Sequence, residues 1–407
     1  MAKKDYLPVI LGSDENAYGT ARLFSEFCLE KPLMLCTRQL VPTMYSHLCR
    51  VELIPDFDKE TVFPSALLRV LHREQAAYEK FVVISCSDYY TNMLSRHFAE
   101  FEGLIANPYL SPDLLVTLDT KDRFYALCEK HGMDYPKTVV AEPEQRLRVA
   151  EELPFSFPIV VKPENSNAYE YLHCQFEGKQ KVFFFQSKEE YLQMVRSMNT
   201  SDYRGKLILQ EFIPGGDDAM RVMNSYSDPQ ATVRMMCLGQ PVLEYYDPKT
   251  AGNYAAILTR SDPEVYRRLQ QFLQEIGYVG FCNIDMKYDR NTGRYVLFEI
   301  NPRLGRSSFC VRSAGYNMMK ILVDDVIYHR PQECTFSQTT GLWSNVPRGI
   351  LRKYVKDPQL QKELRRHKIL HTLYLWSDMS LKRLYRISRY YFAQYRSFRK
   401  YYFDKEP

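Results

Sequence analysis

Residues 280–303 read GFCNIDMKYDRNTGRYVLFEINPR, and this stretch predicts two strands joined by a tight turn. Residues 289–293 have the composition of a hairpin turn. Side chains two residues apart on a strand point to the same face, and residues that face each other across a hairpin do so as well. With the strands in register about this turn, Asp285, Glu299 and Asn301 share one face. A register shifted by one residue would separate them.

That shared face offers two carboxylates and one amide oxygen, which are hard ligands. Mg²⁺ prefers such ligands and takes the rest of its shell from water and substrate phosphates. The alternative is an ordinary hairpin with solvent-facing acids, and it suits Asp289, which lies in the turn. It suits Glu299 less well, because Glu299 follows the apolar run at 295–298. We therefore interpret the hairpin as a candidate Mg²⁺ site.

The hairpin resembles the metal-binding hairpin of the ATP-grasp superfamily, in which an acid precedes Glu-x-Asn on the next strand. Three further motifs precede it in the order of that superfamily, and together they span roughly 185 residues. Each motif alone is weak, but four in order are specific. They are LDTK at 118–121 with PKT at 136–138, FPIVVKP at 157–163, and LQEFIPGGDD at 209–218.

The resemblance implies ATP and Mg²⁺ as cofactors. Taken alone, each lysine or arginine would be read as a solvated surface charge, and the order of the motifs reverses that reading. The implied nucleotide contacts are Lys121 and Lys162 on the phosphates, Glu211, Phe212 and Ile213 around adenine, and Asp217 or Asp218 on ribose. The implied catalytic cation is Arg303, holding an acyl phosphate or oxyanion, with Arg306, Ser307 and Ser308 reaching the same site.

The loop at 164–173 departs from the superfamily pattern because it has no glycine. In many relatives a glycine-rich loop closes over the phosphates. Asn165, Ser166 and Asn167 are the replacement donors here, since asparagine tolerates positive φ. His173 is either a phosphate donor or a loop histidine without a role.

The residue pattern predicts an α/β protein. Short apolar runs alternate with helical patterns in the first part of the chain, which indicates a parallel sheet. Ligands of such sheets lie at the carboxyl ends of the strands, here the turns at 12–18 and 85–90. The expected ATP-grasp fold adds two α+β lobes that sandwich ATP. We expect Asp119 to cap a helix, and two separate strands at 231–238 and 241–245. The expected domains are 1–115 (α/β), 116–212 (lid), 213–335 (metal site) and 336–407 (helical extension).

A narrower resemblance is to the D-aspartate ligases of peptidoglycan cross-bridge synthesis. It rests on VILGSDENAYGTAR at 9–22, VRMMCLG at 233–239 and FCNIDMKY at 281–288. The resemblance implies that ATP phosphorylates the β-carboxylate of D-aspartate. The acyl phosphate is then attacked by the lysine side-chain amine of a nucleotide-linked peptidoglycan precursor. Alternatives are a ligase for another amino acid or dipeptide, and a non-catalytic ATP-binding regulator.

A zwitterionic substrate needs cations and neutral donors. Ser13, Asp14 and Asn16 are candidate contacts to an ammonium group or to the acceptor, although Ser13 and Asp14 would also serve as a helix cap. Arg234 is a candidate cation that would alternatively pair with an acid. Arg22 and Arg221 are further candidates.

Composition limits the class of protein. Apolar residues make up 45% of the 407-residue chain, which excludes disorder, and no apolar run approaches the roughly 20 residues of a membrane span. Ten cysteines stand singly and predict buried, reduced thiols in a cytoplasmic protein. We see no nucleic-acid module, and the oligomeric state does not follow from these residues.

Basic and aromatic residues are concentrated in the last part of the chain. Residues 380–407 contain eight Lys or Arg and two acids. Such a helix would lie on an anionic membrane surface at the inner face of the membrane or contact cell-wall machinery. Alternatively, it would bind an anionic precursor, or pack on the body with its arginines solvated.

Overall fold

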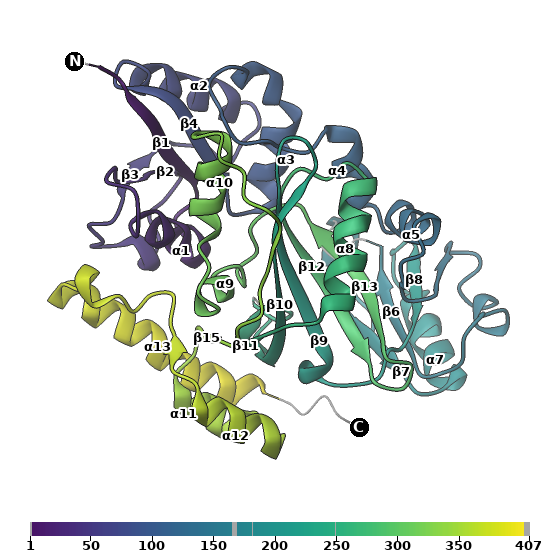
Figure 1. The fold of residues 1–407 in the computed structure, drawn as a ribbon. Coiled ribbons are helices and arrows are strands. Elements are labelled where there is room, and N and C mark those ends of the chain that lie inside the picture. Colours follow the sequence, from purple (N-terminus) through teal and green to yellow (C-terminus); the bar gives the residue numbers. More distant parts are fainter. Residues whose placement is uncertain (1, 165–168, 181, 249, 403–407) are drawn as a thin grey trace. The chain divides into compact units, whose positions relative to one another are not determined.

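The computed structural model describes residues 2–164, 169–180, 182–248 and 250–402 (Figure 1). The chain folds into two units. The first contains the chain up to Met133, then Gly215–Tyr288, and then the chain from Phe298 onward. The second contains Asp134–Pro214 and Asp289–Leu297. The loop residues Asn165, Ser166 and Asn167 lie outside the described residues.

The first unit begins with a four-stranded sheet in the order β3-β2-β1-β4, in which every pairing is parallel. The predicted parallel α/β arrangement is confirmed. Leu11 and Ser85 are partners at the carboxyl ends of β1 and β4, so the turns that follow them lie side by side. The elements are β1 Lys4–Leu11, α1 Glu15–Phe24, β2 Leu33–Cys36, β3 Arg50–Leu53, α2 Phe63–Glu74, β4 Tyr78–Ser85, α3 Asp88–Arg96, α4 Pro112–Asp119 and α5 Lys121–Lys130.

Asp119 does not cap a helix, contrary to expectation. It is the last residue of α4, whose N-cap is Ser111, and Thr120 separates α4 from α5. Ser111 followed by Pro112 is a strong start signal, because serine satisfies a free amide and proline suits the first helical turn. The predicted helix is α5, and its N-cap position is Thr120, one residue after Asp119.

A larger sheet has the order β13-β12-β9-β10-β11-β15-β16, and β14 pairs with β10. It belongs to the first unit except for residues Asp289–Leu297. The two strands expected at 231–238 and 241–245 are one strand, β10, with an irregularity after Pro241. The elements are β9 Met220–Ser227, β10 Val233–Glu244, β11 Tyr254–Arg260, α8 Pro263–Glu275, β12 Gly280–Asp289, β13 Arg294–Asn301, α9 Cys310–Ser313, α10 Met318–Val326, β14 Thr335–Phe336, β15 Leu342–Ser344 and β16 Ile369–Leu370.

Gly239 explains why β10 continues through a sequence that reads as a turn. A Cβ at this position would lie 2.7 Å from Ile257 Cγ2 and 3.0 Å from Val222 Cγ1. Glycine is thus required by the close approach of β9 and β11, not by a turn.

The second unit is built on an antiparallel sheet in the order β5-β8-β6-β7. Aromatic and aliphatic side chains such as Phe183, Tyr191 and Leu209 form its own core. The elements are β5 Thr138–Ala141, β6 Ile159–Pro163, α6 Tyr169–His173, β7 Phe183–Phe185, α7 Lys188–Met198 and β8 Leu207–Glu211.

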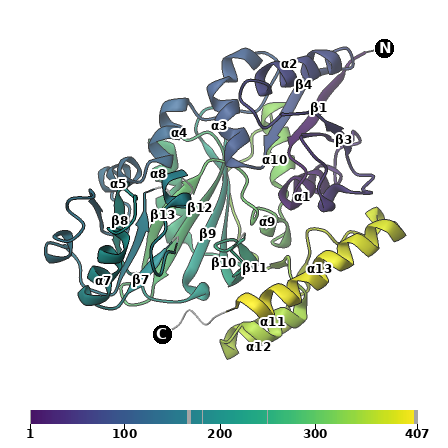
Figure 2. The ribbon, with the colours of Figure 1, turned by 180° about the vertical axis from the view of Figure 1, so that it is seen from behind.

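Three helices end the chain: α11 Arg348–Tyr354, α12 Pro358–Arg366 and α13 Leu381–Tyr401. Figures 1 and 2 show α11 and α12 lying against α13 from opposite viewpoints. Among the described helices, none combines the length and the apolar character that crossing a membrane requires. Eight of the ten free cysteines are buried, as predicted. Short 3-10 helices lie at Val41–Thr43 (η1), Phe98–Phe101 (η2), Val149–Glu151 (η3), Asp217–Ala219 (η4) and Trp376–Asp378 (η5).

Candidate active site

The structure brings Asp285, Glu299 and Asn301 together, on β12 and β13. The Asn301 side-chain amide donates to Asp285 Oδ2 at 3.0 Å and to Glu299 Oε1 at 3.3 Å. The expected sharing of one face is therefore present in the fold. The turn residue Asp289 is buried rather than solvent-facing, because its carboxylate accepts from the Asn291 N–H and the Thr292 hydroxyl within the turn.

The electrostatics of this cluster favour a cation. The surrounding protein desolvates the Asp285 carboxyl and holds its pKa well above its usual range, and the nearby charge of Glu299 adds to this. The Tyr254 hydroxyl donates to Asp285 Oδ1 at 2.7 Å and fixes the carboxylate. A divalent cation would relieve the repulsion between the two acids, and their oxygens suit Mg²⁺.

The cluster is too small to hold a metal ion by protein ligands alone. Within the described residues, no group of three or more His, Cys, Asp or Glu side chains is placed to hold a metal. Two carboxylates and one amide leave room in an octahedral shell for water and phosphate oxygens. The residues therefore fit a Mg²⁺ ion that arrives with a phosphate-bearing ligand.

Lys121, the first residue of α5, lies against the same cluster. Its ammonium donates to Glu299 Oε2 at 2.9 Å and to the Phe298 carbonyl at 3.0 Å. The lysine and the acids thus form one charged group, as a shared phosphate site requires.

The side chains of Asp285, Glu299 and Asn301 face a polar cavity of about 320 Å³ in the first unit. Seven of the residues expected at the site from the sequence form its wall: Asp14, Asp285, Glu299, Asn301, Arg303, Arg306 and Ser307. Others were not singled out from the sequence, although residues 86–88 belong to a turn where ligands were expected. They are Cys86, Ser87, Asp88, Gly252, Asn253 and Tyr254, together with Asn283, which lies within the hairpin motif.

Arg303 lies at the edge of the cavity and is oriented by two partners. Its Nε and Nη2 donate to the Asp88 carboxylate at 2.7 and 3.0 Å, and Nη2 lies 3.4 Å from Asn301 Oδ1. The Arg303 side chain is 18% exposed, whereas that of Asp88 is 60% exposed. Asp88 lies in the turn at 85–90, one of the two strand ends where ligands were expected, and it opens α3 at the carboxyl end of β4.

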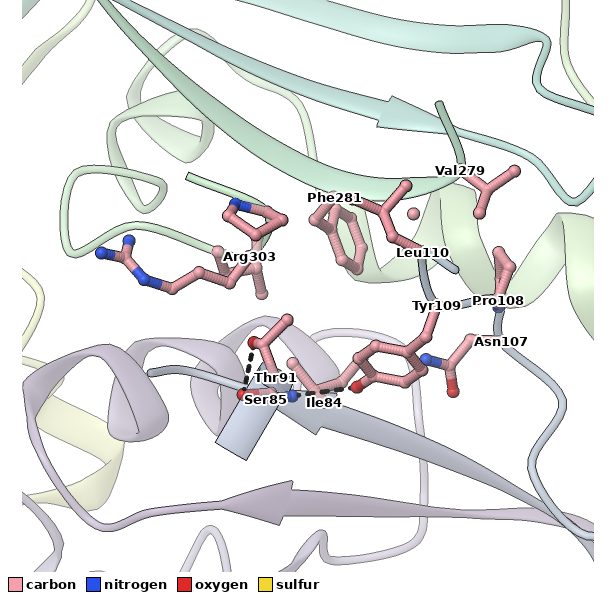
Figure 3. A pocket seen from close by; sticks show the side chains of 13 residues that line it. Ile84, Ser85, Thr91, Asn107, Pro108, Tyr109, Leu110, Val279, Phe281 and Arg303 are labelled. Atoms are coloured by element: carbon pink, nitrogen blue, oxygen red, sulfur yellow. Dashed lines mark hydrogen bonds between the residues drawn. The ribbon is translucent and has the colours of Figure 1, made fainter. Parts of the chain in front are cut away.

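A second, much smaller cavity of about 20 Å³ lies behind Arg303 (Figure 3). There Thr91 donates to the Ser85 hydroxyl at 2.9 Å and the Ser85 N–H donates to the Tyr109 hydroxyl at 3.3 Å. Figure 3 shows the Arg303 guanidinium pointing away from Tyr109 and Phe281. The volume of this small cavity suits a single water molecule. The hydrogen bonds of Ser85 fix the end of β4 behind the arginine.

The first strand–helix turn has a mainly structural role. Asp14 is the N-cap of α1 and accepts from the Ala17 N–H at 2.9 Å while also lining the cavity. Ser13 donates to the Arg38 carbonyl and accepts from the Leu40 N–H, and it is buried. Asn16 donates to the Leu304 carbonyl at 2.7 Å and is 3.4 Å from the Ser308 hydroxyl.

Of the residues in that turn, only Asp14 is thus brought to the cavity wall. Ser13, Asn16 and Ser308 are buried polar side chains whose hydrogen bonds hold loops in place. Burial is also decisive for Glu15, which was not among the candidate site residues. It raises the pKa of the Glu15 carboxyl to about 8 against the opposing effect of Arg306.

The structure does not bring Arg234 to the cavity wall. Its guanidinium lies 2.6 Å from the carboxylate of Asp228, which is fully buried, and it also donates to the Gln332 carbonyl. The alternative of an ion pair within the fold is therefore the one observed. Arg22 likewise donates to the carbonyls of His371, Thr372 and Tyr374.

The residues expected to contact adenine lie in the second unit. Glu211 ends β8, its N–H donates to the Lys137 carbonyl, and its Oε1 accepts from the Lys137 N–H at 2.9 Å. The backbone N–H of Glu211 is thus already hydrogen-bonded within the sheet. The Phe212 ring meets the Phe184 ring edge-on at 4.7 Å, and Ile213 is buried. Lys162 lies on β6 opposite Ile208.

The two expected ribose acceptors lie in the first unit. The Asp217 carboxylate accepts from the Glu244 N–H at 3.0 Å and from the Tyr246 hydroxyl at 2.8 Å, so it fixes η4 to the end of β10. The carbonyl of Asp218 accepts from Arg221 and Gln240. His173, on α6, is exposed and its ring lies 4.1 Å from that of Tyr169.

Comparison with known proteins gives consistent results. The family model "Carbamoyl-phosphate synthase L chain, ATP binding domain" matches residues 255–323, which include the metal-type hairpin. A D-aspartate ligase of Enterococcus faecium is 38% identical over 416 residues, covering 99% of this chain and 98% of that protein.

Solved structures agree at the level of the fold. An L-amino acid ligase of Bacillus licheniformis has a TM-score of 0.53 and 15% identity, covering 82% of this chain and 76% of that one. N5-carboxyaminoimidazole synthetase of Staphylococcus aureus has a TM-score of 0.59 and 12% identity, covering 90% and 87%. The expected ATP-grasp fold is confirmed.

Proposed function

The chain belongs to the D-aspartate ligase family of ATP-grasp enzymes, and from that premise we propose that it joins D-aspartate to an amine of a peptidoglycan precursor. The enzyme is an ATP-dependent ligase. The finer proposal is that the β-carboxylate is activated and that the acceptor is the lysine side-chain amine of a nucleotide-linked precursor. One observation carries the proposal: a single cavity presents an acid cluster and two arginines.

The reaction has two steps. A carboxylate oxygen attacks the terminal phosphorus of ATP, forming an acyl phosphate and releasing ADP. The acceptor amine then attacks the carbonyl carbon, inorganic phosphate leaves, and the nitrogen loses a proton as the amide forms. A carboxylate is a poor electrophile, and conversion to an acyl phosphate provides a good leaving group.

Different residues of the cavity would bind the metal, the phosphates and the reacting carboxyl group. Asp285, Glu299 and Asn301 would hold Mg²⁺, which, when bound, neutralises phosphate charge during phosphoryl transfer. Lys121 would neutralise further phosphate charge beside them. The planar guanidinium of Arg303 would bind two oxygens of the acyl phosphate or the oxyanion of the tetrahedral intermediate. Asp88 holds that guanidinium in orientation until the substrate arrives.

The charges on the cavity wall support a dicarboxylic amino acid. Aspartate carries two carboxylates and one ammonium group. Arg303 and Arg306 are two cations, and Asp14 and Asp88 are acids able to accept from an ammonium group. An amino acid with a single carboxylate would leave one of the two arginines without a substrate partner. We therefore propose that the two arginines select an acid with two carboxylates.

Trapping the acyl phosphate tests this proposal. The full chain is incubated with Mg-ATP, hydroxylamine and one amino acid at a time, in D and L forms. We expect aspartate hydroxamate and ADP with D-aspartate, and chromatography against authentic β- and α-hydroxamates identifies the activated carboxylate. A hydroxamate with another acid alone would retain the ligase and contradict the substrate. The α-hydroxamate would contradict the proposed carboxylate.

A matched pair of variants links the product to the cavity. Glu299→Gln removes one charge from the acid cluster, and Glu264→Gln removes one from an exposed position on α8. At the Mg²⁺ concentration that just saturates the unchanged protein, we expect hydroxamate formation to fall sharply in Glu299→Gln and to stay unchanged in Glu264→Gln. If no acid gives a hydroxamate, the trap is repeated with a nucleotide-linked pentapeptide. Amide formation there would show that the acceptor binds first, and its absence would contradict the proposed acceptor.

A further inference from the structure

The terminal helix α13 has one face that packs on the first unit. Ile387, Tyr391 and Phe398 are buried at helical spacing, and Arg383 is fully buried. Arg383 Nε lies 3.2 Å from Asp378, and its guanidinium lies 4.3 Å from the centre of the Tyr18 ring. This face is buried against the rest of the unit, which explains how the helix is held.

A second apolar stripe lies on a separate side of the helix and is exposed. Leu381 is 87% exposed, Tyr385 60%, Phe392 68% and Tyr395 41%. Intervals of four, seven and three residues place these side chains on one line along an α-helix. A single exposed apolar residue needs no explanation, but a continuous stripe indicates a contact surface.

Cations flank and interrupt this stripe. Lys382, Arg386, Arg389, Arg396, Arg399 and Lys400 are exposed, and no aspartate or glutamate occurs between Leu381 and Tyr401. Arg389 donates to the Tyr385 hydroxyl at 3.1 Å, so a cation and an aromatic ring are held side by side. The exposed face of α13 therefore combines apolar side chains with positive charges and carries no acidic side chain.

An apolar groove continues the stripe into the body of the unit. The groove has a volume of about 300 Å³, and Phe392 and Tyr395 of the stripe form one of its walls. Tyr374, Tyr391 and Pro347 add apolar surface, and Arg348 adds a cation. Trp376, in η5 directly before α13, is 78% exposed. The apolar surface thus extends beyond the helix itself.

We propose that the outer face of α13 docks the protein on an anionic lipid surface. Helices with an apolar stripe beside Lys and Arg lie in the membrane interface, with the rings in the headgroup region and the cations on anionic lipid. The stripe spans about 20 Å at the helical rise of 1.5 Å per residue, which suits a continuous surface better than one small ligand. A second copy of the chain would oppose this face with the same positive charge. The proposal does not rest on which amino acid is ligated.

Vesicle binding tests the proposal with the full chain. We expect the protein to sediment with vesicles of phosphatidylglycerol and phosphatidylcholine, to do so less at high salt, and not to sediment with phosphatidylcholine alone. The chain has two tryptophans, of which Trp343 is buried and Trp376 exposed. Binding should shift the fluorescence of Trp376, and Trp376→Phe should abolish that shift. Absence of binding to the anionic vesicles, or equal binding to both kinds, would overturn the proposal.

Charge variants locate the surface. Replacing Arg386, Arg389 and Arg396 by glutamine should lower vesicle affinity roughly 100-fold, at about fivefold per cation. The matched control removes the exposed cations Lys31, Arg69 and Arg267 in the same way and should change binding little. Circular dichroism and thermal unfolding check that both variants fold.

Apolar variants test the stripe separately. Phe392→Ser should weaken vesicle binding, whereas Leu29→Ser, at a fully exposed site elsewhere, should not. Equal losses in a variant and its matched control would contradict the assignment to α13. Unchanged vesicle binding in the triple arginine variant, with weaker binding of a nucleotide-linked precursor, would identify the face as an acceptor site and overturn the lipid proposal.

Discussion

Replacing Arg303 with methionine separates a catalytic role from a structural one. The side chain would lose its two hydrogen bonds to Asp88, at 2.7 and 3.0 Å, and the longer contact to Asn301. The Arg303 side chain is 18% exposed, and methionine keeps most of its apolar stem. The substitution therefore removes charge and hydrogen bonds with little loss of packing.

The structural cost of this change is small. Asp88 is 60% exposed, and an ion pair with such an exposed partner contributes about 1 kcal/mol or less, because water screens it. The catalytic cost is larger, because removing one donor to a developing oxyanion lowers kcat by about 100- to 1,000-fold. We expect a kcat loss of that size with an almost unchanged unfolding free energy.

The assay is the initial rate of hydroxamate and ADP formation at saturating Mg-ATP, compared with urea unfolding. Arg312→Met is the matched control. Arg312 forms a similar, partly exposed ion pair with Glu26, with a nitrogen–oxygen distance of 2.9 Å, and neither residue lines the cavity. Asp88→Asn should lower kcat less than tenfold, since it only releases the arginine. Equal kcat losses in Arg303→Met and Arg312→Met, or a change confined to the KM for ATP, would refute the reasoning.

Three further predictions concern the acid cluster and buried charges. Glu299→Gln should raise the Mg²⁺ concentration that supports half-maximal ADP release by at least about tenfold; an unchanged Mg²⁺ requirement would contradict the metal assignment. Asp378→Asn should destabilise the fold by about 3–5 kcal/mol in urea unfolding, because it leaves the buried Arg383 without its counter-charge. A loss under 1 kcal/mol would refute this. Burial raises the pKa of Glu15 to about 8 from 4.5, so the folded state retains a proton that the unfolded chain loses. The melting temperature should therefore fall from pH 5 to pH 8 relative to Glu15→Gln, and parallel pH profiles would be inconsistent with this.

Local patterns in the sequence predicted some elements well and others poorly. The parallel strands of the first unit were recognisable because short apolar runs alternate with helical patterns. Strand β9 was not, because its buried positions include the polar residues Asn224, Ser225 and Ser227. Ser225 donates to the Met235 carbonyl, and Asn283 donates to Asn224. Such partners come from other strands, so no local pattern reveals them.

The sequence determined which residues form the acid cluster. Strand periodicity places Asp285, Glu299 and Asn301 on one face of a hairpin whose turn lies between them, and these distances along the chain are short. The order of the motifs also indicated the superfamily. Both inferences depend on local spacing, which is fixed by covalent geometry and by the two-residue period of a strand.

Only the tertiary structure decided what surrounds that cluster. Asp88 reaches Arg303 across 215 positions of sequence, and Tyr254 reaches Asp285 across 31. The tertiary structure also showed that Arg234 pairs with the buried Asp228, whereas Asp14 lines the cavity. The sequence shows which polar side chains are present. Which of them are buried, and which hydrogen-bond or ion-pair partners they have, depends on how distant segments pack, and residue spacing does not encode this.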